Sequence, residues 1–164
     1  MKKFFAILTI ITLAMGLCGN VLKMSDTKER IVEIYYVDHS MLRLIPMRVE
    51  LGEKTTHEAA NEVIDLIIKG QDFNENILRV IPNIKNCISV KIKNSTAVVN
   101  LKEKFVKNRS ENTIHGLLGI YQIVNSLVSI DGIDNVKFLV NGKEEKNLID
   151  GIDLRETFIP DYYM

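Results

Sequence analysis

Histidine and carboxylate residues are the first side chains in this sequence that could do chemistry. His57-Glu58 begins the motif of a zinc-protease helix, in which a second histidine three residues after the glutamate completes the metal site. The residue at that position is Asn61, so the motif is incomplete. His39 and His115 have no cysteine or histidine at the spacing of a closed metal site. The sequence therefore predicts no metal site.

A calcium loop is the next candidate. Asp72, Asn74 and Asn76 have the spacing of the first ligands of an EF-hand. However, Ile77 occupies the sixth position, where the sharp turn needs glycine, and Asn83 occupies the twelfth, where the loop needs a bidentate glutamate. The sequence also has no phosphate-binding loop, no dinucleotide-binding glycine motif and no nucleophile elbow. We therefore expect no cofactor.

Several carboxylates remain, and any two that meet in space could act as a general acid and a general base. Each lies in an expected turn, at a helix cap or on an alternating polar face, which is typical of solvated surface charge. We therefore predict that the protein is not an enzyme. These residues are Glu103, Glu111, Asp131, Asp134, Glu144 and Glu145.

The N-terminal residues have the form of an export signal. Lys2 and Lys3 precede an uncharged apolar run, 4–17, which is 14 residues long. A helix needs about 20 residues to cross a bilayer, so this run alone is too short. We predict that residues 1–17 are a signal peptide or an anchor and that residues 18–29 form a tether.

Three fates of this segment are open. Small residues allow ordinary cleavage after Gly16, Cys18 resembles the modified cysteine of bacterial lipoproteins, and a longer run through Leu22 would give an uncleaved anchor. Leu17 stands where a lipoprotein signal usually has a small residue. We favour the lipoprotein, with Cys18 as the lipid anchor and the domain on the outer face of the bacterial cytoplasmic membrane.

Composition excludes several other classes. The formal net charge is zero and no dense Lys/Arg cluster is present, so we expect no nucleic-acid partner. Cys18 and Cys87 are the only cysteines, which excludes a disulfide-rich scaffold. Because free cysteine is among the most buried residue types, we expect Cys87 in the core.

The first half of the domain, which we place at 30–155, reads as a hairpin and a helix. "RIVEIYYVD" and "MLRLIPMRVEL" are the two strands, with a bulge or an edge position at Pro46. Thr55 and Glu58 have the spacing of a capping box, and Gly70 ends the helix. The apolar stripe of this helix consists of Ala60, Val63, Ile64, Ile67 and Ile68.

The second half repeats this order. "CISVKIK" and "TAVVNL" form a hairpin around Asn94-Ser95, and a helix follows with Ser110 as its N-cap. "VKFLV" is then a strand that ends at the hairpin dipeptide Asn141-Gly142, and "NLIDGIDL" is expected to pair back as a short edge strand. The apolar stripe expected on the second helix consists of Ile114, Leu117, Leu118, Tyr121, Val124 and Val128.

These elements predict an α+β fold in the order β-β-α-β-β-α-β-β. The two helices are expected to pack on one face of a mixed or antiparallel sheet. Residues 156–164 form a C-terminal tail, and Tyr162 and Tyr163 are expected to pack on the tail's own domain rather than to form a contact patch.

The order of these motifs resembles the GerMN domain family of sporulation and spore germination proteins. The resemblance covers residues 31–152 and is carried by "LRLIPMRVEL", "VIDLIIKG", "VIPNIKNCISVKIKNSTAVVNLKEKF" and "IVNSLVSIDGIDNVKFLVNGK". The sequence departs from the family where Gly70-Gln71 replaces a frequent Gly-Pro. The resemblance implies a small α+β interaction module of an exported or lipid-anchored protein, and it supplies no catalytic residues.

We therefore expect a non-catalytic, membrane-tethered interaction or scaffold domain in sporulation, spore germination or cell-envelope assembly. Its partners would be envelope or sporulation proteins, with self-association left open. The alternative is an envelope hydrolase or a carbohydrate- or peptidoglycan-binding lipoprotein whose carboxylates converge only in the fold. A concave pocket with two converging carboxylates would favour the alternative. An exposed sheet with charges scattered outward would favour the interaction module.

Overall fold

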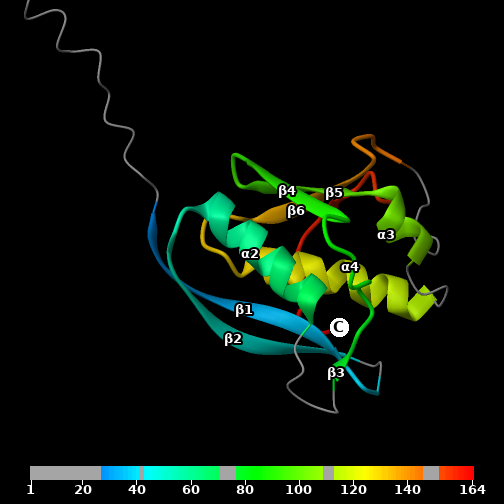
Figure 1. The fold of residues 1–164 in the computed structure, drawn as a ribbon, viewed down its shortest axis with the longest axis horizontal. Helices are drawn as coiled ribbons and strands as arrows, with labels where there is room; N and C mark the ends of the chain where they lie inside the picture. Colours follow the sequence, from blue (N-terminus) through cyan, green and yellow to red (C-terminus); the bar gives the residue numbers. More distant parts are fainter. Residues whose placement is uncertain (1–26, 41–42, 71–76, 109–112, 146–151) are drawn as a thin grey trace, which may run out of the picture.

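The computed structural model describes residues 27–40, 43–70, 77–108, 113–145 and 152–164. Two helices lie between two β-sheets, so the described residues form three layers (Figure 1). The α+β class is confirmed. The expected single sheet is wrong, because the strands divide into a three-stranded sheet and a four-stranded sheet. Each sheet buries one face against the helical layer, and alternating burial in a sequence does not show which strands pair with each other.

The first sheet has the order β2-β1-β3. β1 (Lys28–Asp38) pairs antiparallel with β2 (Leu44–Lys54), and the short β3 (Ile77–Leu78) pairs with the end of β1. Pro46 lies in regular register opposite Tyr35 on the edge strand β2, so the predicted edge position is confirmed. The register shifts elsewhere, between Arg30 and Ile31.

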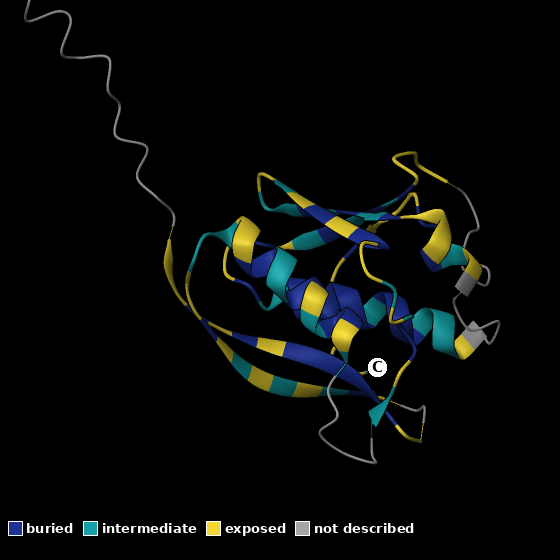
Figure 2. Ribbon diagram, in the orientation of Figure 1, coloured by how far each residue is buried: buried dark blue, intermediate teal, exposed yellow. Residues whose placement is uncertain are grey.

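Helix α2 (Thr56–Lys69) follows its predicted signals closely. The Thr55 hydroxyl accepts a hydrogen bond from the Glu58 amide at 3.2 Å, and the Glu58 carboxylate accepts one from the Thr55 amide at 2.9 Å. Gly70 ends the helix with a φ of 67°. Every residue of the predicted apolar stripe is buried, as the dark blue bands on this helix show (Figure 2).

The second sheet has the order β4-β5-β6-β7, with β5 and β6 parallel to each other. Its strands are β4 (Ile88–Lys93), β5 (Thr96–Leu101), β6 (Asn135–Val140) and β7 (Thr157–Phe158). The Asn94-Ser95 turn is confirmed, and Asn141 and Gly142 form the predicted two-residue turn with φ values of 49° and 78°. The strand expected at 147–154 lies mostly outside the described residues.

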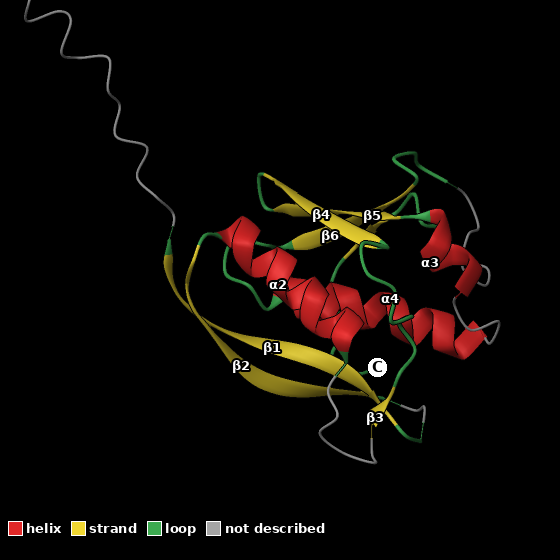
Figure 3. Cartoon of the chain, viewed as in Figure 1, coloured by secondary structure: helices red, strands yellow, loops and turns green. Residues whose placement is uncertain are grey.

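Helix α4 (Thr113–Val128), drawn in red in Figure 3, differs from its prediction in which residues are buried. Ile114, expected in the core, is 57% exposed, whereas nearly all residues from 118 to 127 are buried. The reason is that α4 contacts β1, β6 and α2, so most of its circumference is covered and a one-sided stripe is not needed. The proposed N-cap Ser110 and its neighbour Glu111 lie outside the described residues. The short helix α3 (Glu103–Asn108), which precedes α4, was not expected.

The C-terminal tail is part of the core. Phe158 of β7 is buried and makes edge-on ring contacts with Tyr121 at 6.1 Å and with Phe138 at 5.3 Å, and Leu154, just before the tail, is buried as well. The tail therefore packs on its own domain through Phe158, as predicted. Tyr162 is 59% exposed and keeps one ring contact, with Tyr35, whereas Tyr163 is fully exposed, so the same prediction is wrong for Tyr163. Cys87 is also buried as predicted, and this burial raises the pKa of its thiol. Among the described residues, no helix is long and apolar enough to span a membrane.

Candidate interaction surface

The described carboxylates singled out in the sequence lie at three places on the chain: Glu103 in α3, Asp131 and Asp134 between α4 and β6, and Glu144 and Glu145 after β6. Glu103 pairs with Lys107 at 2.6 Å and Glu144 with Lys137 at 2.6 Å. The neighbouring ammonium group lowers the pKa of Glu103 through a hydrogen bond and its charge. Asp134 and Glu145 are exposed, and Glu111 lies outside the described residues, as does Cys18.

The histidines are equally dispersed. His39 lies in the turn after β1, His57 at the start of α2 and His115 in α4. The His57 ring lies 3.1 Å from the side-chain amide of Asn61, one turn further along the helix. Within the part of the chain that the structure describes, no group of three or more histidine, cysteine or acidic residues is placed to hold a metal ion.

A shallow hollow of about 590 Å³ lies on the first sheet, where β1 meets the end of α4 and the C-terminal tail. It contains one carboxylate, one guanidinium and two tyrosine rings. The lining residues are Ile31, Val32, Glu33, Tyr35, Arg48, Ser129 and Tyr162. We call this feature the hairpin hollow.

The floor of the hairpin hollow is held in place by a hydrogen bond within β1. The Tyr35 hydroxyl donates to the Glu33 carboxylate at 2.9 Å. Burial, together with this bond to an anion, raises the pKa of Tyr35, so the phenol stays protonated and remains a donor at neutral pH. Arg48 lies opposite Glu33 across the hairpin, is exposed, and forms no ion pair with a described residue.

Helix α4 closes the edge of β1 beside the hollow. The Tyr35 amide donates to the Ser126 hydroxyl at 2.9 Å, and the Glu33 amide donates to the Ser129 hydroxyl at 3.1 Å. These hydroxyls take the place of a neighbouring strand, so this stretch of β1 is not free to pair with another chain. The sequence pattern singles out neither Ser126, which lies within the apolar helix α4, nor Ser129, which directly follows it, although polar residues in and beside an apolar helix are a signal for such a role.

The tail forms another wall of the hollow. The buried Asn125 side chain donates to the Asp161 carbonyl at 2.8 Å and accepts from the Asp161 amide at 3.0 Å. Beyond this point the Tyr162 ring lies 6.0 Å from the Tyr35 ring, and Leu44 of β2 donates its amide to the Met164 carbonyl at 2.8 Å. The tail thus crosses from α4 over β1 to the edge of β2.

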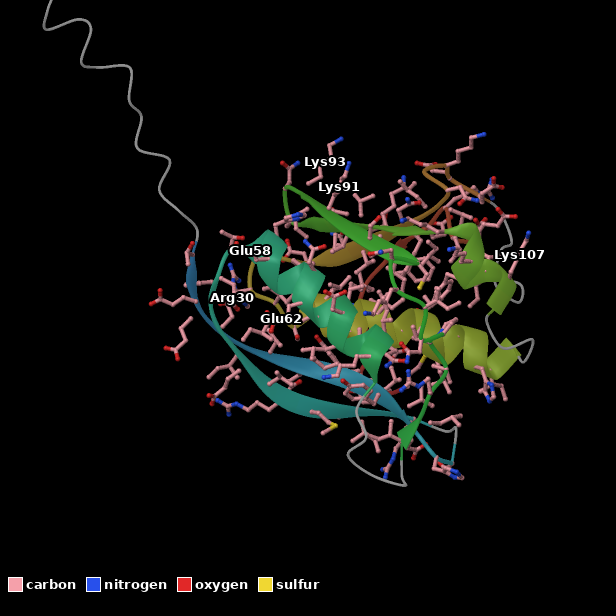
Figure 4. All side chains as sticks on the ribbon, viewed as in Figure 1. Arg30, Glu58, Glu62, Lys91, Lys93 and Lys107 are labelled. Atoms are coloured by element: carbon pink, nitrogen blue, oxygen red, sulfur yellow. The ribbon has the colours of Figure 1, made fainter. Side chains whose placement is uncertain are left out.

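Arg30 fixes the opposite end of the hairpin, where it is labelled in Figure 4. Its guanidinium is buried and donates to the Lys54 carbonyl at 2.9 Å, to the Thr56 hydroxyl at 2.7 Å and to the Asp131 carbonyl at 3.0 Å. The turn after α4 is therefore tied to β1, β2 and α2. Gly132 in this turn has a φ of 94°, a left-handed conformation that glycine adopts without steric cost.

The family model Germane, described as "Sporulation and spore germination", matches residues 33–146, which is most of the chain. The matched range includes β2, α2, β4, β5 and α4, and β1 from Glu33 onward. A search among curated proteins finds no significant match.

Solved structures share the fold. The first GerMN domain of the sporulation protein GerM from Bacillus subtilis is similar with a TM-score of 0.61 and 18% identity, over 77% of this chain and 96% of that domain. The tandem GerMN domains of the same protein give a TM-score of 0.61 and 19% identity, over 79% of this chain and 46% of theirs. A candidate lipoprotein from Clostridium perfringens gives a TM-score of 0.54 and 19% identity, over 80% of this chain and 87% of its own.

Proposed function

Because the chain belongs to the Germane family of sporulation and spore germination, with its GerMN-type fold, we propose that it is a non-catalytic protein-interaction domain. It acts as a membrane-tethered scaffold in sporulation, spore germination or assembly of the cell envelope. Its partners are envelope or sporulation proteins that it meets at the outer face of the bacterial cytoplasmic membrane.

The hairpin hollow is the observation that carries this proposal. Ile31 and Tyr162 are 46% and 59% exposed there, next to the exposed Arg48. Tyrosine and arginine are enriched at the centres of protein interfaces, because they combine large contact areas with polar groups. The alternative of an envelope hydrolase is tied to two converging carboxylates, and Glu33 is the single carboxylate among the described residues that line the hollow.

The tether supports the membrane part of the proposal. β1 begins at Lys28, so residues 19–27 link a lipid-bearing Cys18 to the sheet. Nine extended residues span at most about 30 to 32 Å. The domain would therefore reach partners in the same membrane or close above it. Two or more acyl chains on Cys18 would hold it there stably, whereas one chain would not.

Site-specific cross-linking tests the proposal. A photo-reactive residue replaces Ile31 in the hollow of the full-length chain, and a matched variant carries it at Lys91, which is exposed on β4 (Figure 4). Both are irradiated in sporulating and in vegetative cells, and the adducts are identified by mass spectrometry.

We expect adducts with an envelope or sporulation protein from position 31 and not from position 91. Recovery of no such protein in either cell state would contradict the scaffold. Enrichment of peptidoglycan fragments in place of protein would favour a carbohydrate-binding or hydrolytic lipoprotein.

A further inference from the structure

The face of the β1–β2 hairpin that is turned away from the helices carries an uneven charge. Outward residues of β1 alternate with buried ones such as Val32 and Ile34, and the register places each opposite an outward residue of β2. The cross-strand pairs on this face are Glu29 with Glu53, Ile31 with Glu50, Glu33 with Arg48 and Tyr35 with Pro46. We call this surface the acidic hairpin face, since four carboxylates and one guanidinium leave it with three negative charges in excess.

Ion pairs between described residues neutralise the charges of the nearby lysines but not the charges of these glutamates. Lys28 and Lys54 also face each other across the hairpin, but Lys28 is paired with Asp131 at 2.9 Å and Lys54 with Glu62 at 2.9 Å. None of the four glutamates forms an ion pair with a residue in the described ranges. Glu29 and Glu53 are thus directly opposed like charges, an arrangement that destabilises a sheet.

The hairpin hollow lies within this acidic surface and offers an apolar contact. Ile31 stands between the opposed glutamates and Glu33 along β1, and the Tyr162 ring lines the same hollow. The bonds from Asn125 to Asp161 and from Leu44 to Met164 fix the tail on both sides of Tyr162. The surface is therefore largely formed before a partner arrives, which lowers the entropy lost on binding.

We infer that the acidic hairpin face docks a basic segment of a separate protein, with one apolar side chain in the hairpin hollow and lysine or arginine side chains against the glutamates. The inference rests on the proposed interaction function and names the chemistry of its partner. The same negative charge disfavours nucleic acids and anionic lipid headgroups on this face.

Defined peptides test the charge and the apolar contact separately. The probe is the fluorescent peptide Lys-Lys-Leu-Lys-Lys, compared with Glu-Glu-Leu-Glu-Glu and Lys-Lys-Ser-Lys-Lys, and binding to the full-length chain in detergent is followed by anisotropy. We expect the first peptide to bind about tenfold or more tightly than either of the others, and to lose affinity as salt is raised. Equal affinity for the acidic peptide, or affinity that does not change with salt, would overturn the inference.

Two chain variants with the same change in net charge locate the site. The face variant is Glu29→Gln, Glu50→Gln and Glu53→Gln, which leaves Glu33 and its bond to Tyr35 in place. The control variant removes three exposed carboxylates elsewhere, Asp134→Asn, Glu145→Gln and Glu156→Gln. We expect affinity for the basic peptide to fall about tenfold in the face variant only. An equal fall in both variants, or none in the face variant, would overturn the inference.

A second copy of the chain is the competing occupant, because Lys91 and Lys93 are exposed on β4 of the other sheet (Figure 4). Sedimentation of the full-length chain decides this point. Self-association that is abolished both by the face variant and by Lys91→Glu with Lys93→Glu would overturn the inference in favour of a second copy.

Cross-linking from position 31 separates this inference from the proposed function. An adduct whose contact segment is rich in lysine or arginine, and which is lost in the face variant, supports both. A protein adduct that persists in the face variant leaves the interaction function standing and overturns the basic partner. No protein adduct at all removes the interaction function itself.

Discussion

Replacing Asn125 with alanine should detach the C-terminal tail from α4. The buried amide makes two hydrogen bonds with the backbone of Asp161, at 2.8 and 3.0 Å. Each intramolecular hydrogen bond contributes about 0.5 to 1.5 kcal/mol to stability, so losing both costs about 1 to 3 kcal/mol. Asp161 is only half-buried, so water can bond to part of its backbone amide and carbonyl once the Asn125 side chain is gone. We therefore expect a stability loss in the lower half of this range.

Urea denaturation measures the loss. For a domain of this size the slope is about 1 to 3 kcal/mol per molar urea, so a loss of about 2 kcal/mol lowers the midpoint by about 1 M. The matched control is Asp161→Ala, because both bonds from Asn125 go to the backbone of residue 161 and survive this change. We expect the control to lose only the exposed bond from the Tyr163 amide to the Asp161 carboxylate.

Equal shifts of the urea midpoint in the two variants would refute the claim that the two hydrogen bonds between Asn125 and Asp161 hold the tail on α4. So would an unchanged rate of hydrogen exchange at the amide of residue 161 in Asn125→Ala, because that amide would then have been unprotected from the start.

Three further predictions follow from the core, the charges and the N-terminus. Val124→Ala and Ile64→Ala should each cost about 1 to 4 kcal/mol in urea titrations, since both side chains are buried, and unchanged midpoints would contradict the described core. Lys28 lowers the pKa of Asp131, so the folded state binds the proton of this carboxyl less readily than the unfolded chain does. The small contribution of this exposed pair to stability is complete at neutral pH and fades as pH falls below the usual aspartate pKa of about 4. This pH dependence should be absent from the stability profile of Lys28→Gln. Cys18→Ser should abolish lipid labelling and leave the domain folded; a mature N-terminus at Leu17 or at Met1, read by mass spectrometry, would mean secretion or an uncleaved anchor.

The elements that sequence predicted well are those whose signals are local. Thr55, Glu58 and Gly70 define α2 through contacts within a few residues, and Asn141-Gly142 defines its turn through backbone conformation alone. Such signals depend only on neighbouring residues, and the spacing of the apolar residues then predicts which face of the helix is buried. The division into two sheets depends on pairing between distant strands, such as β5 with β6, and no local pattern specifies it.

Helix α4 shows why the site was harder to predict than the fold. Its expected stripe assumed one buried face, but β1, β6 and α2 cover most of it. Asn125 and Ser126 are polar but buried, so a prediction from the spacing of apolar residues does not place them in the core. Asn125 bonds to Asp161, which is 36 positions away in the sequence, and Ser126 bonds to Tyr35, which is 91 positions away. The role of both residues therefore becomes visible only when β1 and the tail are in place.

The same polar residues connect stability to recognition, and this connection can be tested. Asn125 is not among the residues that line the hairpin hollow, yet it holds the tail at Asp161, next to Tyr162. If the Tyr162 ring contributes to the hollow, Asn125→Ala should weaken binding of the Lys-Lys-Leu-Lys-Lys peptide at temperatures where the variant remains folded, whereas Asp161→Ala should not. Tyr162→Ala provides the reference, because it removes the ring itself while leaving the Asn125 bonds intact. Peptide binding that is weaker in Tyr162→Ala but unchanged in Asn125→Ala would show that the Tyr162 ring stays in place without the Asn125 hydrogen bonds. The hydrogen bond between Leu44 and Met164 would then be what holds this wall of the hollow.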